Sequence, residues 1–122
     1  YCVAGGEAYP AIVEARAIPE AGSPVVIEGQ AGAVEVLPIE QDHGAIPSKG
    51  FRIGDFAYCN DVVRLPEAAL DALQGVRLLV VDALRHTPHP THATVAQALA
   101  WVERVRPERA VLTNMHLDLD YS

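Results

Sequence analysis

The sequence predicts an α/β or layered α+β domain in which short β-hairpins precede a helix–strand–helix–strand unit. In the first half, apolar residues fall in short runs between Gly- and Pro-rich turns, as is typical of hairpins. After residue 62, one continuous apolar run lies between two segments that carry helical signals. The 122 residues contain no internal repeat and no low-complexity segment, so we expect one domain at most, with a real core.

The first half is predicted to form short strands at residues 11–17, 24–28 and 33–40, separated by turns such as "EAGSP" and "GQAG". Two more short strands, "GFRIG" and "FAYCN", meet at a Gly-Asp pair, residues 54–55, which fits a tight primed turn. Sequential hairpins of this kind argue against a purely doubly wound parallel sheet.

Residues 65–75, "LPEAALDALQG", are predicted to form a short helix. Pro66 suits the first helical position, and Gly75 suits the C-terminal cap. The stretch "VRLLVVDAL", residues 76–84, is an apolar run of the kind seen in a strand that is buried on both faces.

A second helix is predicted over residues 94–106, where apolar residues recur at helical spacing and give one apolar face: Val95, Ala98, Leu99, Val102 and Val105. Thr94 and Gln97 form a capping-box pair at its start, and Pro107 ends it. A final strand, "RAVLTNMH", follows over residues 109–116 and runs into polar residues.

The composition excludes several classes of function. The net charge of −7 argues against nonspecific binding to nucleic acid or to an anionic membrane. No apolar run approaches the length of a membrane span. The two cysteines, Cys2 and Cys59, show no CxxC spacing, so we expect a reducing, cytoplasmic setting. The expected partner is a small molecule, with no nucleic acid and no membrane, and a homodimer is a possible assembly.

Residues with metal-binding chemistry follow four of the predicted strands. His43 follows the strand at 33–40, Asp61 follows "FAYC", the loop "RHTPHPTH" follows the apolar strand, and His116 follows the last strand. Imidazole together with carboxylate suits zinc, manganese or iron. The sequence has no HxH or HExxH element, so these residues alone leave both a metal site and incidental histidines open. Cys59 could also be a ligand, although a strand cysteine more often packs in the core.

Two stretches carry a resemblance to a known family. "IEQDHGAIPSKGFRIGDFAYCNDV" and "LLVVDALRHTPHPTHATVAQALAWVERVRPERAVLTNMHLDLDY" resemble the C-terminal half of a metallo-β-lactamase-fold hydrolase. The most similar subgroup is that of the phosphodiesterases that open phosphoribosyl 1,2-cyclic phosphate. The likeness spans residues 35–121 and implies the C-terminal half of an αββα sandwich.

The family's H-x-H-x-D-H motif, which belongs to the N-terminal half, does not occur in this sequence. The chain also opens on "YCVAGGEAYP" without an initiator Met. We therefore expect residues 1–122 to be a single partial domain, inactive alone, whose full-length parent carries the motif and is the active enzyme.

The resemblance implies a role for several residues. His43 resembles a ligand to one metal ion, and Asp61 resembles the carboxylate that bridges two. His92 resembles the catalytic histidine that contacts the phosphate or protonates the leaving oxygen, and its place just before a helix suits an anion. The last ligand is normally the His of an L-T-H sequence, where this chain has Asn114. Either Asn114 binds weakly or His116 supplies the imidazole, and we favour His116.

The resemblance implies two divalent ions, zinc or manganese, and a phosphodiesterase that hydrolyses a small cyclic or diester phosphate. Arg85 could orient the phosphate, although an Arg at a strand end is usually solvated. His86 and His89 flank Pro88 in a turn that its two prolines are predicted to stiffen, and neither histidine is expected to take part directly. Two other functions stay open: a noncatalytic α/β module that binds a partner, and a thioester, lactone or lactam hydrolase of the same fold.

Overall fold

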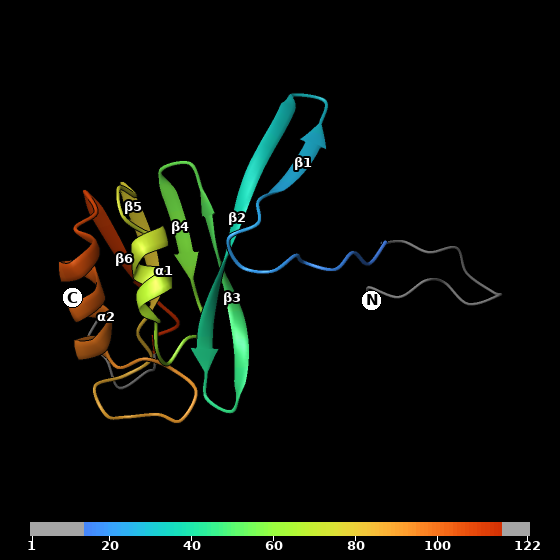
Figure 1. Cartoon of the computed structure of the whole chain (residues 1–122). Coiled ribbons are helices and arrows are strands. Elements are labelled where there is room, and N and C mark those ends of the chain that lie inside the picture. The colour runs from blue at the N-terminus through green and yellow to red at the C-terminus, as the bar shows by residue number, and fades with distance from the viewer. Residues whose placement is uncertain (1–13, 116–122) are drawn as a thin grey trace.

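A computed structural model describes residues 14–115, which form a six-stranded mixed sheet with two helices on one face (Figure 1). The strand order follows the chain, β1-β2-β3-β4-β5-β6. The first three pairings are antiparallel and the last two are parallel. This mixed topology confirms the layered α+β prediction. The elements are β1 (Val25–Gly29), β2 (Gly32–His43), β3 (Ile46–Ile53), β4 (Phe56–Cys59), α1 (Glu67–Ala72), β5 (Leu78–Asp82), α2 (Val95–Val105) and β6 (Arg109–Thr113).

The hairpin between β3 and β4 has the predicted primed turn. Ile53 pairs with Phe56, which leaves a two-residue loop of Gly54 and Asp55. Gly54 has φ +56°, and Asp55 is not among the residues with positive φ. A glycine with positive φ in the first loop position is the pattern of a type II′ turn, whose twist matches that of the strands.

The prediction of a strand at residues 11–17 is wrong for residues 14–17, which are irregular, whereas residues 11–13 lie outside the described part. A strand needs a neighbour for its backbone groups, and residues 14–20 pair with no strand within 14–115. Conversely, β2 extends beyond 33–40 as far as His43, because pairing with β3 satisfies its backbone whatever the polarity of its side chains.

The helices cover one face of the sheet and bury its apolar side chains. Pro66 precedes α1 as its N-cap residue rather than occupying the first helical position. The capping box of α2 is present, with Thr94 and Gln97 bonded in both directions, as predicted. Trp101 packs in the core and is 9% exposed, whereas Leu99, expected on the apolar face, is 53% exposed. The buried face of α2 is therefore centred on Ala98, Trp101 and Val105.

The direction of the strands places the functional residues. Because β2 and β4 each lie antiparallel to β3, they run in the same direction, and β5 and β6 are parallel to β4. The C-terminal ends of these four strands therefore meet at one edge of the sheet (Figure 1). The residues that follow β2, β4, β5 and β6 are brought together there, as the strand-end argument requires.

Candidate metal centre

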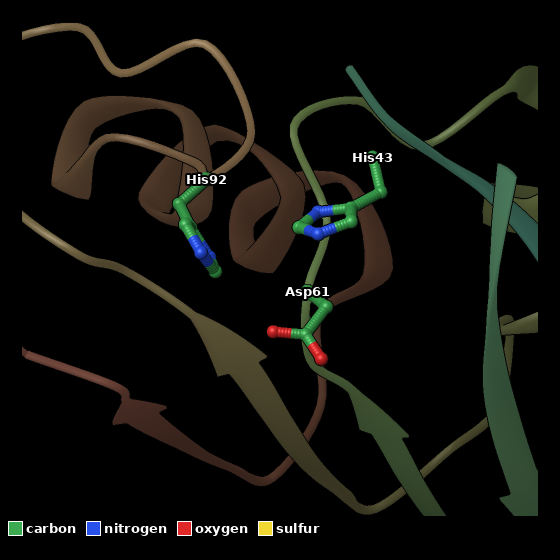
Figure 2. A group of neighbouring side chains, drawn as sticks. All are labelled: His43, Asp61 and His92. Atoms are coloured by element: carbon green, nitrogen blue, oxygen red, sulfur yellow. The ribbon is translucent and has the colours of Figure 1, made fainter. Parts of the chain in front are cut away.

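Three side chains with metal-binding chemistry converge at this edge. His43 ends β2, Asp61 lies just after β4, and His92 lies in the loop before α2. Each offers one ligand atom, and these atoms all lie within 4.8 Å of one another. Figure 2 shows the three side chains facing a common space from three different segments. The structure thus brings together His43, Asp61 and His92, which the sequence suggested separately.

The ring of His43 is oriented by the loop that carries His92. Its Nδ1 lies 2.6 Å from the backbone oxygen of Thr91. A carbonyl oxygen only accepts hydrogen bonds, so Nδ1 carries the proton and Nε2 presents its lone pair. Metal-binding histidines commonly donate their other ring N–H in this way.

The ring of His92 is oriented by Asp82, a fully buried carboxylate at the end of β5. His92 Nδ1 lies 2.6 Å from Asp82 Oδ2. Two further donors reach the same carboxylate, the backbone N–H of Val62 at 3.3 Å and Nδ2 of Asn114 at 3.1 Å. With Nδ1 engaged by Asp82, Nε2 of His92 is the ring atom left for a metal ion or a substrate.

Asp82 is a functional residue that the sequence reasoning missed. The signal was present, because Asp82 ends an apolar run and a charged residue is almost never fully buried without a partner. What the sequence did not show is the partner. His92 lies ten positions away and Asn114 lies 32 positions away.

Asp61 is exposed and has a left-handed backbone, with φ +51°. Its side chain has a weak neighbour in Nδ2 of Asn60, 3.5 Å from Oδ1. The carboxylate is thus accessible and faces the two imidazoles, as a metal-binding or bridging ligand would.

The structure gives Arg85 contacts within its own loop. Its guanidinium donates to the backbone oxygens of Thr87 and Pro88, at 3.3 Å and 3.0 Å. These bonds brace the loop, and the substrate-binding role of Arg85 stays a prediction.

His116 lies outside the described residues, so its role as the last ligand also stays a prediction. The alternative, Asn114, turns its amide nitrogen toward Asp82.

Cys59 does not behave as a ligand. Its side chain is fully buried in β4, and burial raises the pKa of its thiol to about 12. Since the thiolate is the form that binds metal, the protonated thiol packs in the core, as the sequence suggested.

The donor set fits a divalent ion of borderline character. Two imidazole Nε2 atoms and one carboxylate make three protein ligands, which is the usual number at catalytic zinc sites. Hydrogen bonds from the Nδ1 atoms hold both rings in the required tautomer. His92 lies beside His43 and Asp61 in this group, and the catalytic role that the resemblance implies for it stays a prediction.

Comparison with known proteins identifies the family. The model of the beta-lactamase superfamily domain matches residues 3–115. The chain belongs to this superfamily and has the metallo-β-lactamase fold. It is similar to the crystal structure of a diphosphatase of the PhnP family, with 33% identity and a TM-score of 0.71 over 78% of this chain and 37% of that one. It also shares the fold of the Bacillus subtilis protein YhfI, with 13% identity and a TM-score of 0.74 over 93% of this chain and 47% of that one.

Among curated proteins, this chain is similar to an octanoyltransferase of Porphyromonas gingivalis (strain ATCC BAA-308 / W83), with 29% identity over 87 residues. The match covers 70% of this chain and 18% of that protein. The chain thus spans less than half the length of each of these three proteins. The metallo-β-lactamase fold implies the use of divalent metal, with which the His43, Asp61 and His92 group agrees. No helix within residues 14–115 is long and apolar enough to cross a membrane.

Proposed function

We propose that the full-length protein is a metal-dependent phosphodiesterase that hydrolyses a small cyclic or diester phosphate, using two divalent ions, zinc or manganese. The observation that carries the proposal is the convergence of His43, Asp61 and His92 with both imidazoles held in the metal-binding tautomer. The similarity to a diphosphatase at 33% identity supports phosphorus as the centre attacked.

His43 and Asp61 would hold the ions from this chain. When bound, such ions polarise phosphoryl oxygens and lower the pKa of bound water to about 7. His92 presents Nε2 to the same space, so a proton that it passes to a leaving oxygen must travel through that atom. The positive end of the α2 helix dipole adds a favourable field for a phosphate beside His92.

His43 and Asp61, even with His116 as the predicted last ligand, do not complete a site for two ions. We propose that residues 1–122 are the C-terminal half of one domain, and that an upstream H-x-H-x-D-H motif supplies the remaining ligands. On this basis the 122-residue chain alone is inactive. A cytoplasmic location and a homodimer are further parts of the proposal, and fractionation and light scattering test them.

The test compares the full-length protein with its Asp61→Ala variant. We expect about two ions per wild-type chain by plasma emission spectrometry, and hydrolysis of bis(p-nitrophenyl) phosphate but not of a thioester panel. Asp61→Ala should lose most of the bound metal and at least about 100-fold in rate, because even the loss of a group that only orients a ligand costs about 10–100-fold. The matched control is Asp71→Ala, an exposed aspartate on α1, which should retain both.

Three outcomes would contradict the proposal. A wild-type protein that binds no ion would favour a partner-binding module. Hydrolysis confined to thioesters would favour the other hydrolase class. Full metal content and full activity in Asp61→Ala would show that Asp61 is not a metal ligand.

A further inference from the structure

The backbone of Asp61 adopts a conformation that needs an explanation. Its φ of +51° lies in the left-handed region, which L residues other than Gly seldom occupy. Aspartate is one of the residue types that tolerate this region, but it has no preference for this region over the usual ones. Some other part of the molecule must hold Asp61 in this conformation.

Two side chains fix the peptide planes on either side of Asp61. The amide Nε2 of Gln41 donates to the backbone oxygen of Asn60 at 2.5 Å, and the hydroxyl of Ser48 donates to the backbone oxygen of Asp61 at 2.7 Å. The first bond orients the peptide before the Asp61 Cα, and the second orients the peptide after it. Together they restrict both φ and ψ of Asp61.

Gln41 and Ser48 form a connected unit rather than two separate contacts. They face each other across the β2–β3 pair, where Gln41 Nε2 also donates to Ser48 Oγ at 3.0 Å. Ser48 therefore accepts from Gln41 while it donates to Asp61, and chained hydrogen bonds strengthen one another. The next residue of β2, Asp42, docks the following part of the loop through its backbone, with Val63 N–H donating to Asp42 O at 2.7 Å.

This unit is a costly way to stabilise a fold. Gln41 is fully buried, and its Oε1 has no hydrogen-bond partner within residues 14–115. A buried polar atom that lacks a partner disfavours folding. A buried glutamine is therefore better explained by what its amide positions, namely the loop of Asp61.

We propose that Gln41 and Ser48 are positioning residues, which impose the left-handed backbone of Asp61 and so direct its carboxylate toward His43 and His92. The inference rests on the proposed function, because it takes Asp61 to be a metal ligand. The same strand then serves the site twice: Gln41 positions the carboxylate, and His43, two residues on along the same face of β2, supplies an imidazole.

The test uses Ser48→Ala, Ser48→Thr and Gln41→Met in the full-length protein, with Co²⁺ as the probe. Ser48→Ala and Gln41→Met should weaken Co²⁺ binding by about 10–100-fold, as is usual when a group that orients a ligand is lost. Ser48→Thr keeps the hydroxyl and should stay within about threefold of wild type, since its bond to Asp61 can still form. Urea midpoints, measured for each variant, separate this loss from a general loss of folding.

A measurement on the metal-free protein separates the two proposals. Positive φ brings Hα of Asp61 close to its own amide proton, which gives a strong intra-residue NOE. Loss of that NOE in Ser48→Ala and Gln41→Met supports the inference even if the wild type binds no Co²⁺, a result that would overturn the proposed function alone. Retention of the NOE in both variants would overturn the inference. So would equal Co²⁺ affinity in Ser48→Ala and Ser48→Thr when the wild type binds Co²⁺.

Discussion

Gly44→Ala is the substitution that most directly tests how the two histidine segments are held together. Gly44 follows His43 in the β2–β3 turn and has φ +73°. A Cβ atom at this position would lie 2.8 Å from the backbone oxygen of Pro90 and 3.1 Å from Cγ2 of Thr91. Because the first contact is with backbone, the turn and the His92 loop would have to move apart, which strains the bond from His43 to Thr91.

The expected loss has two parts. An L side chain at positive φ costs about 1–2 kcal/mol, and forcing an atom into a packed contact costs about 1–3 kcal/mol more. Gly44→Ala should therefore lower the free energy of unfolding by about 2–5 kcal/mol, a large share of a typical 5–15 kcal/mol. Gly54→Ala is the matched control, because Gly54 begins the same kind of two-residue turn, with φ +56°, but no atom lies within 4 Å of the added Cβ.

Equilibrium urea unfolding of the metal-free protein measures both losses. We expect Gly54→Ala to lose about 1–2 kcal/mol, so the difference between the variants reports the steric part alone. Titration with Co²⁺ should show weaker binding in Gly44→Ala and unchanged binding in Gly54→Ala. If Gly44→Ala lost no more stability than Gly54→Ala, the close packing of the turn against the His92 loop would be refuted.

Three further predictions concern the surroundings of His92. Asp82→Asn should lose about 1.5–3 kcal/mol of unfolding free energy, as expected for bonds to a charged group, and ¹⁵N NMR should show His92 no longer held in the Nδ1–H tautomer; the exposed Asp71→Asn should change neither. Thr94→Ala removes the N-cap bond of α2 and should lower the free energy of unfolding in urea by about 1 kcal/mol. Thr94→Ser keeps the hydroxyl and should retain most of that stability. Desolvation and the positive charge of Arg85 lower the pKa of His89 below 6.5. As the pH falls below that value, the unfolded chain binds more protons than the folded chain, so the stability falls. His89→Asn should reduce the change in urea midpoint between about pH 7.5 and 5.5, and an equal change in variant and wild type would contradict this.

Much of the fold could be predicted because its signals are local. The capping box joins Thr94 and Gln97, three positions apart, and the apolar run that became β5 is continuous. Both patterns act within one turn or one strand, where neighbouring side chains decide the backbone. The failed strand at residues 14–17 shows the limit, since a strand exists only when a second one pairs with it.

For the candidate site, the sequence by itself determined the residue types and their places at strand ends, and the family resemblance added that His43, Asp61 and His92 serve one site. Only the tertiary structure decided how they are held. The bond from Asp82 to His92 spans ten positions and that from Gln41 to Asn60 spans 19. Contacts at such separations depend on which strands become neighbours in the sheet, and that choice is made by the packing of the whole domain rather than by any local pattern.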